Sequence, residues 1–174
     1  MDIFIEQMVK KKRGVKEFLI VLASMLGVLA VLFALTFAMM IPGLGFMIFA
    51  VCVVLIYLLY FLVTSINLEF EYSFTNGVLD VDKIINARRR KSMLEINIRK
   101  MELMGDRKAP EFVRYMKKSG LTKVFAGTHM DAEDLCFLVF LDDDGKEKML
   151  LFNPNEKVKD AIRRYNPKKV VLSQ

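Results

Sequence analysis

The stretch from Phe18 to Ile66 constrains this chain more than any other part, because it contains no Asp, Glu, Lys, Arg or His. An α-helix rises about 1.5 Å per residue, so about 20 apolar residues cross a hydrocarbon core of about 30 Å. The stretch is therefore long enough for two crossings. Pro42 and Gly43 interrupt it near the middle, since proline removes a helix hydrogen bond and glycine relaxes the backbone. We expect a transmembrane helical hairpin over Phe18–Ile41 and Leu44–Ile66.

The alternative for these residues is a hairpin buried in the core of a soluble protein. Soluble helices normally carry polar side chains along one face, and neither half of the stretch does so. A cleaved signal peptide also fits poorly, because the first apolar run is longer than a signal-peptide core and a second run follows directly. Membrane insertion is therefore the prediction, with the lipid bilayer as the first expected partner.

Residues 1–17 form a basic segment with the run Lys10, Lys11, Lys12 and Arg13. Short segments rich in Lys and Arg stay on the cytoplasmic side of a membrane, whereas the uncharged connection between the two apolar runs is easier to translocate. We therefore expect a cell-membrane protein with two spans and both termini in the cytoplasm. The basic run is then a topology signal, or it contacts acidic lipid headgroups, which contribute about 1 kcal/mol per basic residue.

Small residues recur along one face of the first span at spacings of three and four. Such faces let helices approach closely in lipid, where no hydrophobic force drives their association. We expect this face to be the seam between the two spans, with Ala34 at about the depth of Ala50. A seam between two copies of the chain is the alternative. The small residues are Ala23, Gly27, Ala30, Ala34 and Ala38.

Residues 67–174 are enough for one compact cytoplasmic domain. Leu68–Thr75 alternates apolar and polar residues, which is the pattern of a half-buried strand. Asn76-Gly77 follows and predicts a type I′ hairpin turn, since both central residues need positive φ. Val78–Ile85 returns, and Ser92–Lys100 alternates again. The sequence therefore predicts a three-stranded antiparallel meander.

The second half of this domain is predicted from shorter patterns. Asn153 is expected to cap a C-terminal helix with Pro154 at its first position and one apolar face. The predicted fold class is an α+β membrane protein, in which a helical hairpin precedes an antiparallel barrel or sandwich closed by that helix. The elements expected before the helix are a short helix over Pro110–Lys118 and strands over Lys123–Gly127, Leu135–Leu141 and Lys146–Phe152.

The stretch NLEFEYSFTNGVLDVDKIINARRRKSMLEI, behind a pair of apolar spans, resembles bacterial pleckstrin-homology-like (PH-like) domains that follow two membrane spans. The resemblance implies a PH-like fold and a role as a binding module. In phosphoinositide-binding PH domains, basic residues of the first hairpin loop hold the headgroup. Here that loop is Asn76-Gly77, which carries no cation, so the resemblance transfers no binding residue to this chain.

The basic run Arg88, Arg89, Arg90 and Lys91 is the most informative candidate for a site. The first strand of the domain leaves the membrane near residue 67, and the second strand returns over the same length. The loop after it is therefore brought back towards the lipid, where four adjacent cations would attract acidic headgroups. The alternative is a solvated turn or a second topology signal.

The outer face of the first hairpin collects acidic residues. A two-residue turn at Asn76-Gly77 places Glu71 opposite Asp82, and like charges opposite one another are unfavourable unless a cation offsets them. Our first expectation is a plain solvated face, and Arg99 or a basic partner is the candidate for the offsetting cation. A metal site is a further alternative, but no histidine lies near in sequence, so we predict none here.

No pattern in the chain predicts catalysis. His129 is the only histidine, and no nucleophile or acid accompanies it in sequence. The acidic run before Gly145 is expected to be a turn, because Phe140 stands where an EF-hand loop needs an acid. We therefore expect no catalytic residue, no cofactor and no metal. A net charge of +6 with inward-facing aromatic residues does not favour nucleic acid as a partner.

The sequence thus predicts a non-enzymatic, membrane-anchored cytoplasmic module that binds a protein or an acidic lipid surface. The alternative is an accessory subunit of a larger membrane complex. It would assemble with another membrane protein, or with a second copy, through the helical hairpin or the acidic first hairpin.

Overall fold

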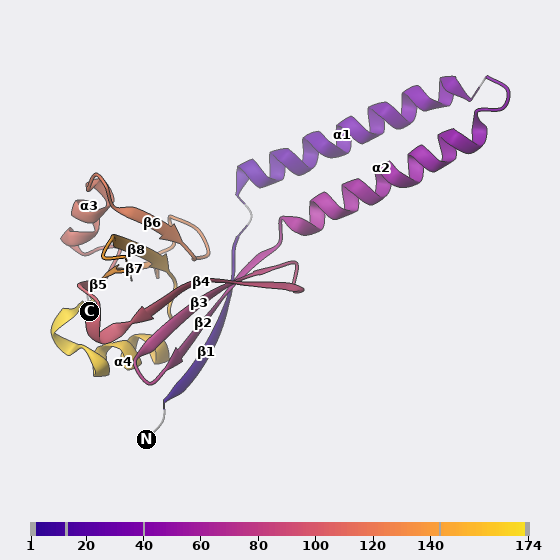
Figure 1. The fold of residues 1–174 in the computed structure, drawn as a ribbon. Helices are drawn as coiled ribbons and strands as arrows, with labels where there is room; N and C mark the ends of the chain where they lie inside the picture. Colours follow the sequence, from indigo (N-terminus) through magenta and orange to yellow (C-terminus); the bar gives the residue numbers. More distant parts are fainter. Residues whose placement is uncertain (1–2, 13, 40, 143, 173–174) are drawn as a thin grey trace. The chain divides into compact units, whose positions relative to one another are not determined.

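The computed structural model describes residues 3–12, 14–39, 41–142 and 144–172. The chain divides into two compact units, residues 1–12 with 68–174, and residues 13–67. We call the first the head and the second the helical unit; Figure 1 draws both.

The helical unit consists of α1 (Val15–Ala38) and α2 (Gly45–Ser65), which lie side by side (Figure 1). Within them, Glu17–Ala38 and Gly45–Ser65, of 22 and 21 residues, are long and apolar enough to cross a membrane. Almost none of their residues is buried inside the protein. The chain reverses between them, where Gly43 has a φ of +86°. The two predicted apolar helices and the break between them are therefore confirmed.

The seam between α1 and α2 differs from the predicted one. Ala23, Gly27, Ala30 and Ala34 are exposed, as is Ala50, and only Ala38 is half-buried. A Cβ added at Gly27 would meet no atom within 4 Å, so this face packs against nothing in the helical unit. Larger aliphatic side chains fill the space between the helices instead. The partly or fully covered residues in the middle of the helices are Val21, Ser24, Val28, Leu32 and Leu35 on α1, and Ile48, Cys52, Leu55 and Leu59 on α2.

The first sheet of the head has four antiparallel strands in the order β1-β2-β3-β4. They are β1 (Phe4–Lys10), β2 (Leu68–Thr75), β3 (Val78–Ile85) and β4 (Arg89–Asn97). The predicted meander is confirmed, although its last strand begins at Arg89 rather than Ser92. Asn76 and Gly77 have φ values of 49° and 96°, as a type I′ turn requires.

Strand β1 was not predicted, because residues 1–17 were interpreted as a basic segment outside the head. The inward-facing positions of β1 include Gln7, and the outward-facing ones include Phe4 and Met8, so the usual alternation is hidden. The N–H of Lys11 donates to the carbonyl of Leu68 over 2.9 Å. The helical unit is therefore an insertion into the connection between two paired strands, and the head begins before it rather than at residue 67.

The second sheet has the order β6-β8-β7-β5-β9. Pairs β5–β7 and β7–β8 are antiparallel, whereas β5–β9 and β6–β8 are parallel. The sheet is thus mixed, which corrects the predicted all-antiparallel pairing. The two sheets are not closed into a barrel, so the barrel of the two predicted alternatives, barrel or sandwich, is wrong. The strands are β5 (Leu103–Asp106), β6 (Thr122–Phe125), β7 (Cys136–Leu141), β8 (Glu147–Phe152) and β9 (Val170–Val171).

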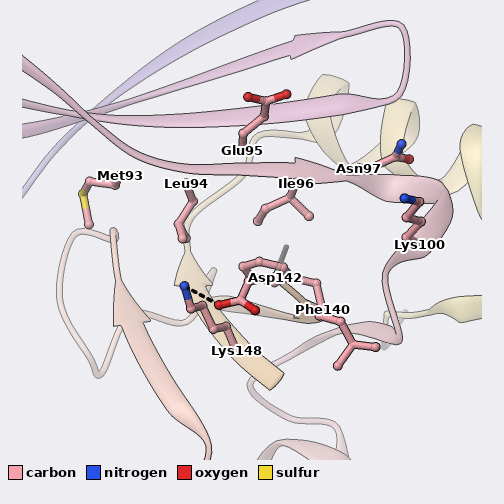
Figure 2. Close-up of a pocket in the computed structure, with 10 residues that line it drawn as sticks. Met93, Leu94, Glu95, Ile96, Asn97, Lys100, Phe140, Asp142 and Lys148 are labelled. Atoms are coloured by element: carbon pink, nitrogen blue, oxygen red, sulfur yellow. Dashed lines mark ion pairs between the residues drawn. The ribbon is translucent and has the colours of Figure 1, made fainter. Parts of the chain in front are cut away.

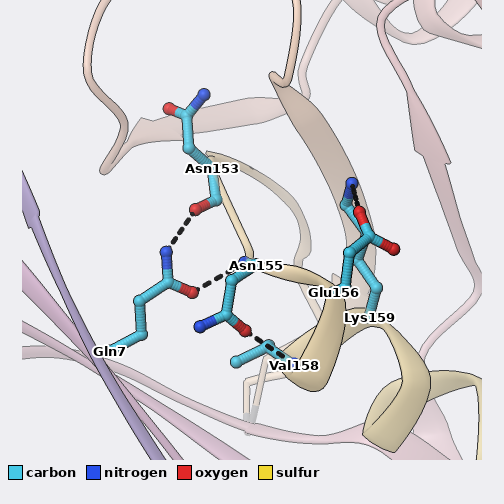
Figure 3. A network of polar contacts seen from close by, with 6 residues as sticks. All are labelled: Gln7, Asn153, Asn155, Glu156, Val158 and Lys159. Carbon is cyan, nitrogen blue, oxygen red and sulfur yellow. Dashed lines mark hydrogen bonds and ion pairs between the residues drawn. The ribbon is translucent and has the colours of Figure 1, made fainter.

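The predicted C-terminal helix is α4 (Glu156–Tyr165), but its cap is Asn155 rather than Asn153. The Asn155 Oδ1 accepts from the N–H of Val158 over 2.9 Å (Figure 3). Asn153 is buried, and its Oδ1 accepts from the N–H of Thr128 over 2.8 Å, so its side chain holds a loop and not the helix. Gln7 of β1 bonds to both residues: its Nε2 donates to Asn153 O and its Oε1 accepts from Asn155 N, each over 2.8 Å.

The main core lies between the two sheets and α4. Phe74, Leu138, Phe152 and Ile162 are fully buried in it, and each such side chain contributes roughly 1.5–3 kcal/mol. Tyr72 is buried with them; its hydroxyl donates to Ala126 O and accepts from Asn153 N, and burial raises its pKa. A smaller core lies under α3 (Pro110–Lys117). Two short 3₁₀ turns complete the head, η1 (Ile98–Lys100) and η2 (Pro167–Lys169).

Candidate functional site

One end of the first sheet gathers the basic residues that the sequence placed in two separate segments. In the strand register Lys10 lies opposite Glu69, Glu69 opposite Ile84, and Ile84 opposite Arg90. Strands lie about 4.8 Å apart, so the two basic segments are roughly 14 Å from one another. The chain also passes between head and helical unit at this end. We call it the basic end: Lys10, Lys11, Lys12, Arg88, Arg89, Arg90 and Lys91.

A tight turn carries the second basic segment. Asn86 and Ala87 have φ values of 52° and 51°, and the N–H of Arg88 donates to Ile85 O over 3.2 Å. This is a type I′ turn, which the sequence pattern missed because its second position is alanine and not glycine. An L-residue in the left-handed region costs about 1 kcal/mol. The turn thus contains strained backbone, and it connects β3 directly to the basic residues at the start of β4.

Arg88, Arg89 and Lys91 are exposed. Throughout the described ranges, no carboxylate pairs with any of these three side chains. Their charge is therefore available to an external anion.

Arg90 has a different role. Its Nε donates to Asp82 Oδ2 over 2.6 Å, and its Nη2 pairs with Glu71 Oε1. Arg90 is thus the cation that offsets the facing pair Glu71 and Asp82. The predicted candidate, Arg99, instead lies over the ring of Tyr165, at 5.7 Å from the ring centre. Arg90 is therefore paired with two carboxylates on the outer face of the sheet and is not a free lipid ligand.

The N-terminal basic residues are also partly engaged. Lys10 Nζ lies 3.2 Å from Glu69 Oε1, but the lysine side chain is 82% exposed, so this surface pair adds little stability. The N–H of Lys12 donates to Thr128 O over 2.9 Å and anchors the loop after β6. Lys11 extends the β1 ladder. Arg13 lies outside the described residues.

The outer face of the same sheet is acidic. Glu6, Ser73, Asp80 and Glu95 lie in one row across the four strands. Burial, followed by the neighbouring Glu95, raises the pKa of Asp80. Burial and contact with Glu6 likewise raise the pKa of Glu71, against the opposing effect of Arg90. The sheet therefore has a cationic end beside an anionic face.

A small cavity lies between β4 and the β7–β8 hairpin (Figure 2). Leu94 and Ile96 face Phe140 there, and an ion pair of 2.8 Å between Lys148 and Asp142 borders it. Its volume of about 240 Å³ is below the roughly 300–1,000 Å³ of usual ligand pockets. Sequence patterns could not find this cavity, because distant segments form it. In the described part of the chain, no cluster of three metal-ligating side chains occurs either.

A family model described as a bacterial PH-like domain (DUF6106) matches residues 1–172. The chain belongs to this family. The matched range includes both units, so the predicted resemblance to bacterial PH-like proteins with two apolar helices is confirmed. PH-like domains are generally binding modules without catalytic chemistry, which fits the exposed cations of this PH-like head better than a reaction site. No curated protein and no solved structure gives a match to the chain.

Proposed function

We propose that this bacterial PH-like protein is a membrane-anchored binding module whose helical unit crosses the cell membrane twice. The basic end of the head contacts acidic lipid headgroups on the cytoplasmic side. The observation that carries this proposal is the bond between Lys11 N and Leu68 O: the segments that lead into and out of the helical unit meet at the end of the sheet that holds the free cations.

The helical unit supports membrane insertion through its surface. Phe33 and Phe46 are 66% and 84% exposed, and large apolar side chains continue along both helices. Water would meet a contiguous apolar patch far larger than soluble proteins normally expose. Lipid tails remove that cost, and about 20 residues are enough for each crossing.

The free cations support the lipid contact. Arg88, Arg89 and Lys91 would contribute about 3 kcal/mol near an acidic membrane, at about 1 kcal/mol each. This attraction acts only within a Debye length of about 10 Å, so it requires the basic end and not merely the head to approach the surface. The same charges favour retention on the cytoplasmic side.

Depth-dependent quenching tests the lipid contact in the full chain. One variant, Ala87→Cys, carries a dye at the basic end, and a matched variant, Thr75→Cys, carries it at the opposite end of the sheet. Both are placed in nanodiscs with headgroup-quenching lipids. We expect stronger quenching at residue 87, increasing with the acidic lipid fraction and decreasing with salt. Equal quenching at both positions would contradict the proposed contact.

Topology needs its own experiment. A phosphatase that is active only outside the cytoplasm is fused in turn to the C-terminus and into the connection between α1 and α2. We expect activity from the second fusion and none from the first. The reverse pattern would place the head outside the cell and overturn the cytoplasmic assignment.

A further inference from the structure

Strand β1 leaves one side of the first sheet open. Asn76 N–H donates to Ile3 O over 3.1 Å, and Lys11 N–H donates to Leu68 O over 2.9 Å. Alternate residues of an antiparallel strand bond to the same neighbour, so the odd-numbered residues of β1 face β2. Lys12 fits this parity, because its N–H turns the other way, to Thr128 O. The even-numbered residues therefore direct their N–H and C=O groups to the open edge: Phe4, Glu6, Met8 and Lys10.

An apolar groove runs beside the start of this edge, between β1 and α4. Its volume is about 500 Å³. Ile3 and Ile5 line it from the strand and Ala161 from the helix. The charged residues Lys157, Asp160 and Arg164 also line it on the helix side. Phe4 is 67% exposed beside it. A strand added to the open edge would direct every second side chain towards this groove.

The remaining side chains of such a strand would lie on the acidic face. Glu6 is exposed on β1 itself, and Glu71, Asp80 and Glu95 follow on the neighbouring strands. Only Glu71 among these four acids pairs with a cation in the ranges that the structure describes. Opposite charges on neighbouring strands attract, so this face favours basic side chains.

We propose that the open edge of β1 and the groove beside α4 bind an extended segment of a partner protein in which apolar and basic residues alternate. The segment adds as a fifth strand: its backbone bonds to Glu6 and Met8, its apolar side chains enter the groove, and its basic side chains lie against Glu6. Strand addition of this kind takes affinity from the backbone and specificity from alternate side chains. The backbone bonds to Glu6 and Met8 do not involve the exposed cations Arg88, Arg89 and Lys91, and the site does not depend on lipid contact.

Amide hydrogen exchange of the full chain in detergent micelles tests strand addition. The probe is a short synthetic peptide of alternating lysine and valine, and the control peptide alternates glutamate and valine. We expect the lysine peptide to protect the amides of Glu6 and Met8, while those of Ile5 and Gln7 stay unchanged because they already bond to β2. Absence of protection, or equal protection by the glutamate peptide, would overturn the proposal. So would protection of these amides in a dimer without any peptide.

Two variants test the two contributions to binding. Met8→Pro removes a donor at the open edge without removing a bond to β2, and proline is tolerated on edge strands in this orientation. Compared with Met8→Ala, Met8→Pro should lower the affinity for the lysine peptide about five- to tenfold. Glu6→Lys should shift the preference to the glutamate peptide. Equal affinity of Met8→Pro and Met8→Ala, or an unchanged preference in Glu6→Lys, would overturn the proposal.

A third variant separates this proposal from the proposed lipid contact. Arg88→Gln with Arg89→Gln should leave affinity for the lysine peptide unchanged. A decrease would mean that the peptide binds at the basic end and would overturn the edge site.

Discussion

The two ends of the first sheet use the same turn for different purposes. Asn76-Gly77 and Asn86-Ala87 both form type I′ turns. At the first, Gly77 O accepts from the N–H of Ile98 over 2.9 Å, and Asn76 Oδ1 accepts from the N–H of Ile3 over 3.0 Å. The second is exposed and leads into free cations. We call the first the packed end, in contrast to the basic end.

The residue at the second turn position differs between the two ends, because one position is packed and the other is exposed. A Cβ on Gly77 would lie 2.7 Å from Cδ1 of Tyr165, so α4 leaves space only for glycine. Ala87 is exposed, and its Cβ is tolerated despite positive φ. Packing therefore determines the sequence of one end, whereas the other keeps a strained residue and displays charge. This difference separates a stabilising end from the end that we propose contacts lipid.

The largest expected effect concerns β1, which contributes to both ends. A fragment of residues 67–174 lacks this strand and exposes the edge of β2, so we expect it to aggregate. Joining residues 3–12 to 67–172 through a short glycine-rich turn should restore a soluble head, because Lys11 and Leu68 are already bonded. Size-exclusion chromatography and amide NMR of the two polypeptides make the comparison. A dispersed, native-like spectrum from the shorter fragment would show that β1 is dispensable.

The next prediction removes charge from the basic end. Changing Arg88, Arg89 and Lys91 to Gln in the rejoined head should weaken partition into acidic vesicles about a hundredfold, at about 1 kcal/mol per cation. The matched control removes three exposed charges beyond the packed end, by changing Arg163, Arg164 and Lys168 to Gln. Vesicle co-sedimentation at several salt concentrations measures both. Equal losses would mean that net charge, and not the basic end, drives binding.

Gly77→Ala tests the packed end. The added Cβ meets the Tyr165 ring, and overpacking of this kind costs about 2 kcal/mol. Urea denaturation of the full chain in mild detergent, followed by circular dichroism, measures the loss. In a Tyr165→Leu background the same change should cost only about 1 kcal/mol, the contribution of positive φ. An equal cost in both backgrounds would exclude the contact with Tyr165 as the cause.

Sequence patterns predicted the features that depend on local interactions and missed those that depend on contacts between distant segments. The β2–β3 register, with Glu71 opposite Asp82, was predictable because the Asn76-Gly77 turn fixes it locally. Its cation was not. A register shift between Val81 and Asp82 brings Arg90, rather than Lys91, into the row with Ile84 on the acidic face. A bulge of one residue leaves no mark in the polar and apolar alternation, so only the structure assigns the pair.

The other features that the sequence patterns missed also depend on contacts between distant segments. Strands β5 and β9 are short and pair with distant segments, as in the parallel contact between Met104 and Val170. Gln7 occupies an inward position because it bonds to Asn153 O, which no local pattern indicates. At the candidate site, the sequence identified both basic segments. It could not show that β1 brings them to one end, because that requires the pairing of residues separated by the whole helical unit.

Ala87→Gly should make the basic end resemble the packed end. Glycine relieves about 1 kcal/mol of left-handed strain but loses part of it to greater freedom in the unfolded chain, leaving about 0.5 kcal/mol of added stability. Urea denaturation measures this, and vesicle partition should not change, since the cations remain. A loss of stability would show that the turn is not strained at this residue.

The smallest effect tests how far the basic end influences the acidic face. Burial and Glu95 raise the pKa of Asp80, so the folded protein holds its proton more tightly than the unfolded chain, and stability falls as pH rises through that range. Asp80→Asn should therefore add about 0.3 kcal/mol at neutral pH, and the gain should vanish once acid protonates the carboxyl in both states. Asp82→Asn should instead destabilise the head at neutral pH, because it removes the partner of Arg90. Urea denaturation at neutral and acidic pH distinguishes them; equal responses would mean that Arg90 influences both carboxylates alike.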